Sequence, residues 1–181
     1  MFYEPKQILL KNNTPAVLRS PTYSDAKAMN AYLKACSGET DFLLRYPEEC
    51  TETEASEGDF LEQIKLSPNH LMIACLIDGE VVGNCSVMFN SMLKTRHRAS
   101  VAIAIRKAYW GLGIGTALFT EMIAAAKEKG ILQLELDYVE GNERAAHLYQ
   151  KMGFVPIGER PDSIRLQDGT LLKEIMMVKK L

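Results

Sequence analysis

Hydrophobic residues fall into short β-rich runs separated by polar turns along much of the chain. The runs lie at 8–10, 16–19, 71–77, 81–89, 100–105 and 132–138, and on both sides of Asp168-Gly169. Asn12-Asn13 separates the first two runs, and Asp78-Gly79 separates the third from the fourth. Because Asp-Gly between two such runs is a strong signal for a two-residue turn, we expect strands joined in hairpins.

A second pattern, in which hydrophobic residues recur three or four positions apart, predicts helices. It is clearest over residues 114–130. Further helices are expected after Thr22, which with Asp25 has the form of a capping box, from about Thr53, and over 143–152. This order of elements predicts a single domain, residues 1–181, of the mixed α/β class: one sheet with helices packed on its faces.

Composition and charge exclude some classes of protein. Hydrophobic residues make up 47% of the chain and the formal net charge is −2, whereas a nucleic-acid-binding protein would usually carry a clear basic excess. The apolar run Leu71–Ile77 is far shorter than the roughly 20 residues of a membrane helix, and the N-terminus has no signal-peptide pattern. The four cysteines form no CxxC pair. We therefore expect a cytoplasmic protein with reduced thiols, no bound metal, and neither nucleic acid nor membrane as a partner.

The segment YWGLGIGTAL places Gly111, Gly113 and Gly115 at alternate positions where a strand ends and a helix begins. The first N–H groups of a helix lack partners within it, so a glycine-rich entry can bring them close to a phosphate. A tight turn with close packing and no ligand explains the same glycines, and spacing alone leaves both interpretations open. The segment fits neither the GxxxxGK[ST] of a P-loop nor the GxGxxG of a Rossmann fold, whose third glycine position is Thr116 here.

Two blocks of residues resemble the GNAT superfamily of N-acetyltransferases. The first is the Q/R-x-x-G-x-G/A motif, which aligns with residues 110–115 and has Trp110 in place of Gln or Arg. The second is N-x-x-A-x-x-L-Y-x-x-x-G-F, matched at Asn142, Ala145, Leu148, Tyr149, Gly153 and Phe154. The resemblance spans residue 16 to the C-terminus. It implies a mostly antiparallel sheet that is splayed between its two central strands and carries helices on both faces.

The resemblance also implies a site for acetyl-coenzyme A (acetyl-CoA). The pyrophosphate is expected on the backbone amides of the glycine segment, and the pantetheine arm between the strands at 100–105 and 132–138. The implied cofactor-binding residues are Ile103, Ala104, Ile105, Trp110, Gly111, Leu112, Gly113, Ile114, Gly115, Thr116, Asn142, Ala145 and Tyr149. For Asn142, capping of the helix that follows is an alternative role, and both roles can hold together.

The activity that the resemblance implies is direct transfer of an acetyl group to a primary amine, without a covalent enzyme intermediate. Tyr149 is expected to donate a proton to the departing thiolate, although a purely structural core aromatic is the alternative. Asp137, which stands where some relatives carry a catalytic Glu, is the candidate acceptor for the proton of the amine. Glu39 and His97 are further candidates. The alternative function is a regulatory or sensor module that binds acyl-CoA without turnover.

The segment Glu39–Glu62 contains nine acids and one base, Arg45. These acids predict a rim that attracts a cationic amine, but a solvated loop and helix explain the same charges. The acceptor is therefore expected to be a small-molecule or peptide amine, with a cationic one as the sharper hypothesis. The acceptor's identity, the acyl chain length and the formation of a homodimer are left open by the sequence.

Overall fold

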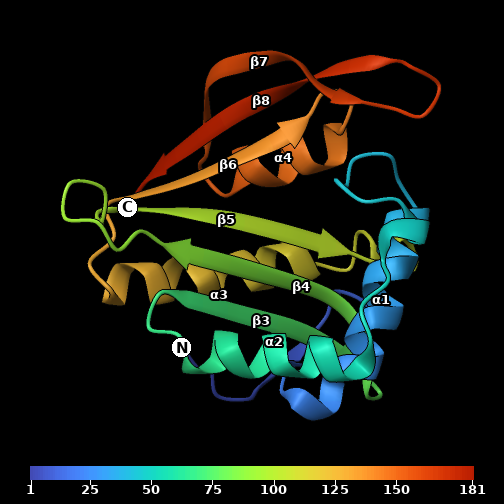
Figure 1. Cartoon of the computed structure of the whole chain (residues 1–181). Coiled ribbons are helices and arrows are strands. Elements are labelled where there is room, and N and C mark those ends of the chain that lie inside the picture. The colour runs from blue at the N-terminus through green and yellow to red at the C-terminus, as the bar shows by residue number, and fades with distance from the viewer.

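In the computed structural model, which describes residues 1–181, eight strands form one sheet in the order β1-β2-β3-β4-β5-β6-β8-β7 (Figure 1). The strands are β1 (Lys6–Leu9), β2 (Pro15–Arg19), β3 (His70–Ile77), β4 (Glu80–Phe89), β5 (Arg98–Ile105), β6 (Gln133–Val139), β7 (Val155–Arg165) and β8 (Leu171–Lys180). The helices are α1 (Ala26–Gly38), α2 (Glu54–Leu66), α3 (Ile114–Glu128) and α4 (Glu143–Lys151), with short 3-10 turns η1 (Tyr23–Asp25), η2 (Pro47–Glu49) and η3 (Lys107–Tyr109). All neighbouring strands run antiparallel except β5 and β6, so the predicted mixed α/β class is confirmed.

Helices cover both faces of the sheet. On one face, α1 and α2 bury Tyr32 and Leu61 against Ala74 of β3. On the other face, α3 buries Leu118 and Phe119 in the larger core cluster. This second face also carries α4, because the ring of Tyr149 lies 5.8 Å from that of Phe119. No helix is both long and apolar enough to cross a bilayer.

The expected local signals form as predicted. Asp78 and Gly79 both adopt positive φ, 49° and 84°, in the turn between β3 and β4. The Thr22–Asp25 capping box is present, although a 3-10 turn precedes the α-helix that it starts. The Thr53 hydroxyl accepts a hydrogen bond of 3.1 Å from the Ser56 N–H and so caps α2.

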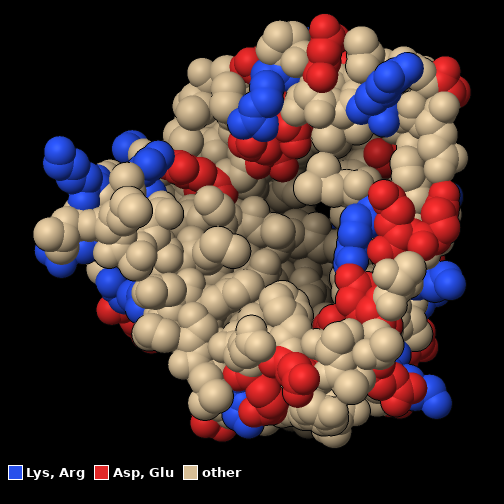
Figure 2. All heavy atoms as spheres, viewed as in Figure 1, with Lys and Arg blue, Asp and Glu red and all other residues tan.

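The centre of the sheet is split. β5 and β6 pair only between Arg98–Ser100 and Gln133–Glu135, and then diverge. β4 stays paired with β5 as far as Ile105, while β8 stays paired with β6 as far as Val139, so a wedge opens between two intact halves of the sheet. Figure 2 shows this region as a hollow with an uncharged floor, on the face of the sheet that carries α1 and α2. The splayed sheet that the resemblance implies is thus confirmed.

Candidate active site

A cavity of about 640 Å³ occupies the wedge between β5 and β6. The end of β5, the glycine segment, α4 and the connection between α1 and α2 form its walls. Of the predicted cofactor-binding residues, all but Leu112 line this cavity. Segments far apart in the sequence are therefore brought together as predicted, whereas Asp137 does not line the cavity.

The glycine segment presents unpartnered backbone donors to this cavity. None of the N–H groups from Gly111 to Thr116 donates a hydrogen bond within the protein, and the first bond of α3 is that from Ala117 N–H to the Gly113 carbonyl, at 3.0 Å. Gly113 is the N-cap residue and offers no side chain to these donors. Such a row of free donors at a helix N-terminus suits a phosphate group. It favours a phosphate-binding role for the glycine segment over a tight turn without a ligand.

The three glycines also have local reasons. Gly111 and Gly113 adopt positive φ of 81° and 92°, which other residues take only with strain. Gly115 lies in the helix, but a Cβ atom there would stand 2.7 Å from Leu148 Cδ2 and 3.2 Å from Ile105 Cδ1. Because Gly115 has no side chain, α3, α4 and β5 can pack closely beside the cavity.

Gly115→Ala is expected to lower the free energy of unfolding by about 1 kcal/mol, because the added methyl group must displace the half-buried Leu148 side chain. Urea unfolding would measure the change. The double variant Gly115→Ala/Leu148→Ala removes the clashing Cδ2 atom and should show a favourable coupling energy. Strictly additive effects of the two changes would show that Leu148 does not impose the glycine.

The backbone of β5 offers fewer groups to the wedge than predicted. The His97 carbonyl accepts a bond of 2.9 Å from Leu132 N–H toward β6, and peptide groups alternate along a strand, so Ile103 and Ile105 also face the wedge. The Ile105 carbonyl, however, accepts a bond of 2.7 Å from Trp110 Nε1. Ala104 points the other way, and its carbonyl accepts the Tyr32 hydroxyl at 2.8 Å. Ile103 is therefore the predicted residue whose peptide group best suits a hydrogen bond to an extended ligand.

Asn142 caps α4, because its Oδ1 accepts a hydrogen bond of 3.2 Å from the Ala145 N–H. Its side-chain amide nitrogen has no partner in the protein, and the residue lines the cavity. The capping role is thus observed, and the amide donor stays available for a ligand, as the sequence allowed.

Tyr149 is buried, with 7% of its surface exposed, and its ring contacts those of Phe119, Phe154 and Tyr138. It lines the cavity, and its hydroxyl has no hydrogen-bond partner in the protein. Burial, followed by the nearby Tyr138 hydroxyl, raises the pKa of Tyr149 to about 12. The hydroxyl oxygen itself is accessible from the cavity, so it can donate a hydrogen bond to a group that enters there.

The candidate proton acceptors lie apart from one another. Asp137 alternates along β6 with Tyr138, whose ring is 5.8 Å from that of Tyr149, so Asp137 projects from the opposite face of the sheet. There its carboxylate accepts a bond of 3.1 Å from Arg160. Glu39 does line the cavity, but its carboxylate accepts bonds from Arg106 Nε, at 3.0 Å, and from a backbone N–H. His97 precedes β5 and lies roughly 25 Å from the cavity end of this strand, at about 3.3 Å per residue.

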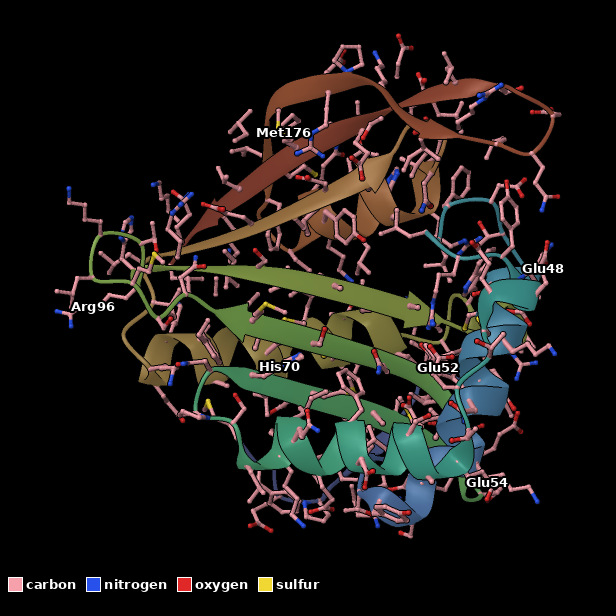
Figure 3. All side chains as sticks on the ribbon, viewed as in Figure 1. Glu48, Glu52, Glu54, His70, Arg96 and Met176 are labelled. Carbon is pink, nitrogen blue, oxygen red and sulfur yellow. The ribbon has the colours of Figure 1, made fainter.

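Most acids of the segment Glu39–Glu62 are engaged within the protein. Five of them bind a donor on the chain: Glu39, Glu48, Glu49, Glu52 and Glu62. Glu57 is buried, and burial raises its pKa. Figure 3 shows Glu48, Glu52 and Glu54 at the outer edge of α1 and α2, away from Arg96 at the other end of the molecule. Arg or Lys side chains pair with Glu39, Glu52 and Glu62. Glu48 and Glu49 accept from neutral donors and keep their charge. The exposed acids without any partner are Asp41, Glu54 and Asp59, so the unpaired negative charge is smaller than the sequence suggests.

Several cavity residues escaped the sequence analysis. Lys11 and Arg144 line the wall beside the glycine segment, and Arg144 stacks over the Trp110 ring at 4.7 Å. Tyr32 of α1 does not line the cavity, but its hydroxyl donates to the β5 backbone that does. Only Arg144 stands within a recognised block, and no local pattern marks the other two, because their role depends on how distant strands and helices pack.

The geometry defines a cavity for a long, phosphate-bearing ligand, with the Tyr149 hydroxyl donor opening into it, as in an acyl-CoA transferase. A family model described as the acetyltransferase (GNAT) family matches residues 39–154. The chain belongs to this family, and it uses acetyl-CoA as co-substrate. The structure holds no group of three or more His, Cys, Asp or Glu side chains placed to bind a metal ion.

Solved structures share the fold. A GNAT-family acetyltransferase from Streptococcus pneumoniae is 29% identical, with 92% of this chain and 99% of that chain covered and a TM-score of 0.86. A ribosomal-protein-alanine N-acetyltransferase from Brucella melitensis is 23% identical over 91% of this chain and 99% of that one, with a TM-score of 0.79. A phosphinothricin acetyltransferase from Sinorhizobium meliloti, in complex with acetyl-CoA, is 19% identical over 92% and 88%, with a TM-score of 0.78.

Proposed function

We propose that the protein is an N-acetyltransferase that moves an acetyl group from acetyl-CoA to a primary amine by direct attack within a ternary complex. The observation that carries this proposal is the unpartnered hydroxyl of the buried residue Tyr149, which opens into the cavity whose other end presents the free N–H groups of residues 111–116. A module that only senses acyl-CoA would need the phosphate end of this cavity but not the hydroxyl donor.

Tyr149 would act chiefly as a hydrogen-bond donor. A thiol has an ordinary pKa near 8.5, about 3.5 units below the value of about 12 for this tyrosine, so complete proton transfer to a thiolate is unfavourable. Because Tyr149 keeps its proton at all physiological pH values, its hydroxyl can stabilise negative charge on sulfur as that charge develops. The Ile103 N–H, which faces the wedge, would polarise the thioester carbonyl.

Asp137 would receive the proton of the amine from the other side of the sheet. Tyr149 projects into the wedge from the face that carries α3 and α4, and Asp137 lies on the face with the hollow of Figure 2. An amine substrate that enters through this hollow would meet the thioester between Tyr149 and Asp137. The two faces thus separate the leaving thiolate from the incoming amine, as direct transfer requires.

Turnover with a panel of amines, followed by release of free thiol from acetyl-CoA, tests the proposed function. Its companion is the melting temperature of the protein with acetyl-CoA, CoA, ATP or NAD, where a ligand at about 100 times its Kd adds about 2.7 kcal/mol. Stabilisation by both CoA species together with turnover of an amine supports the enzyme. Stabilisation without turnover of any amine would favour the acyl-CoA sensor instead.

The acceptor belongs to one of two classes of amine. Structural relatives include one that is named for ribosomal-protein alanine and one that is named for the small molecule phosphinothricin. If the acceptor is cationic, as the sharper hypothesis holds, the carboxylates without a cationic partner would attract it, and Asp41, Glu54 and Asp59 are the exposed ones among them that have no hydrogen-bond partner. We further propose a cytoplasmic location, in keeping with four free cysteines.

Neutralising these three groups in the variant Asp41→Asn/Glu54→Gln/Asp59→Asn is expected to raise the KM of a cationic amine by roughly two- to fivefold at low salt, with kcat unchanged, because attraction of exposed charges is modest and screened. Initial rates at two ionic strengths would measure the effect, with a neutral amine of similar size as the control. An unchanged KM for every cationic amine would show that these carboxylates do not attract the substrate.

A further inference from the structure

The turn between β1 and β2 reaches the glycine segment. The Lys11 N–H donates a hydrogen bond of 3.0 Å to the Leu112 carbonyl, which ties the turn to the loop before α3. The Lys11 side chain then runs along the glycine backbone: a Cβ atom on Gly113 would stand 3.4 Å from Lys11 Cγ and 3.8 Å from Cε. The ammonium group is one bond beyond Cε and therefore lies near the N-terminus of α3.

This ammonium group has no carboxylate partner, although Lys11 lines the cavity. The same is true of two other cations at this end of the cavity, Arg144 and Lys151, and Lys151 donates a bond of 3.2 Å to Thr116 Oγ1. In contrast, Lys6 on the strand before the turn is paired with Glu121. Positive charge has thus been left unneutralised where the backbone also presents free N–H donors.

We infer that Lys11 is a pyrophosphate-binding residue, so that the β1–β2 turn forms part of the cofactor site. A lysine is a point charge with three donors, and it can add a charge-assisted hydrogen bond to a phosphate that the backbone N–H groups already hold. The contact of the Lys11 stem with Gly113, the N-cap residue of α3, assigns this charge to the phosphates on the helix N-terminus. The inference rests on acetyl-CoA binding and requires none of the catalytic roles proposed above.

The test compares equilibrium binding of CoA and of 3′-dephospho-CoA by calorimetry, for the wild type and for Lys11→Met. Methionine keeps the stem that lies against Gly113 and removes the charge. We expect the Kd of both ligands to rise by about tenfold and by the same factor, because both carry the pyrophosphate. Lys11→Arg should restore most of the affinity. Lys127→Met, an exposed cation without an ion pair in the last turn of α3, is the control for net charge and should bind like the wild type.

Three results would overturn the inference. An unchanged Kd would show that the charge is not used, and a loss confined to CoA would place Lys11 at the 3′-phosphate. A lowered melting temperature of the ligand-free variant, with no rescue by Lys11→Arg, would show that the residue only supports the loop. Failure of the wild type itself to bind CoA would count against the proposed function, and it is therefore distinguishable from failure of this inference.

Discussion

Replacement of Tyr149 by Phe is expected to lower kcat by about 10²–10⁴-fold, the usual contribution of a positioned proton donor. The hydroxyl is the only group removed, and it has no partner in the protein that the change would leave unsatisfied. The packing of the ring against Phe119 and Phe154 is kept, so the free energy of unfolding should stay within about 0.5 kcal/mol. The Kd of CoA, measured by calorimetry, should change little because the phosphate end of the cavity is untouched.

Tyr138→Phe is the matched control, because this second tyrosine contributes a ring to the same cluster from the neighbouring strand. It should retain activity within a few-fold of the wild type. The pKa of about 12 for Tyr149 adds a check by pH: since the protonated form is the donor, kcat should show no alkaline decline from this residue below about pH 11. Full kcat in the Tyr149→Phe variant would show that Tyr149 is only a core aromatic.

Asp137→Asn is expected to lower kcat/KM by about 10²-fold near neutral pH, because the protonated amine then loses its acceptor. The deficit should shrink as the pH rises toward the pKa of the amine in solution, which is near 7.7–8.0 for an α-amine and 10.4 for a lysine side chain. Above that pKa the amine arrives unprotonated, so no base is needed before attack, and the proton lost on amide formation can pass to solvent. A pH profile of kcat/KM for the wild type and the variant would show the two curves converge.

The control for this change is Glu174→Gln. Arg160 is bound by Glu174, at 2.6 Å, as well as by Asp137, so either substitution disturbs the same ion-pair cluster. Glu174→Gln should leave kcat/KM nearly unchanged if Asp137 acts on the amine. Equal losses in the two variants, with parallel pH profiles, would assign Asp137 to the support of β6 instead.

Local chemistry made much of the fold predictable. Asp78-Gly79 fixes a hairpin through two positive φ angles, and Thr53 starts α2 through its own hydroxyl, so both signals act within a few residues. The order of elements along the chain and the positions of the helices followed from such signals and from the resemblance. The wall of the cavity that carries Trp110 and Tyr149 was likewise expected, because both recognised blocks lie in it.

The remainder depends on long-range packing that no short pattern encodes. Glu39 lines the cavity as predicted for a candidate base, yet Arg106, 67 residues further on, binds its carboxylate. The alternation along β6 could not tell which face bears Asp137, and the contact of Tyr138 with Tyr149 decides it. Lys11 gave no signal at all, because the turn that carries it meets the glycine segment only in the folded chain.

The brief contact between β5 and β6 has a mechanical consequence. With pairing confined to Arg98–Ser100 and Gln133–Glu135, the two halves of the sheet meet along a short seam rather than a full ladder. An extended ligand lying in the wedge and bonded to Ile103 would contact both halves of the sheet and hold them together. Ligand binding would then stabilise the fold as a whole, so the protein is expected to be most rigid when the co-substrate is bound.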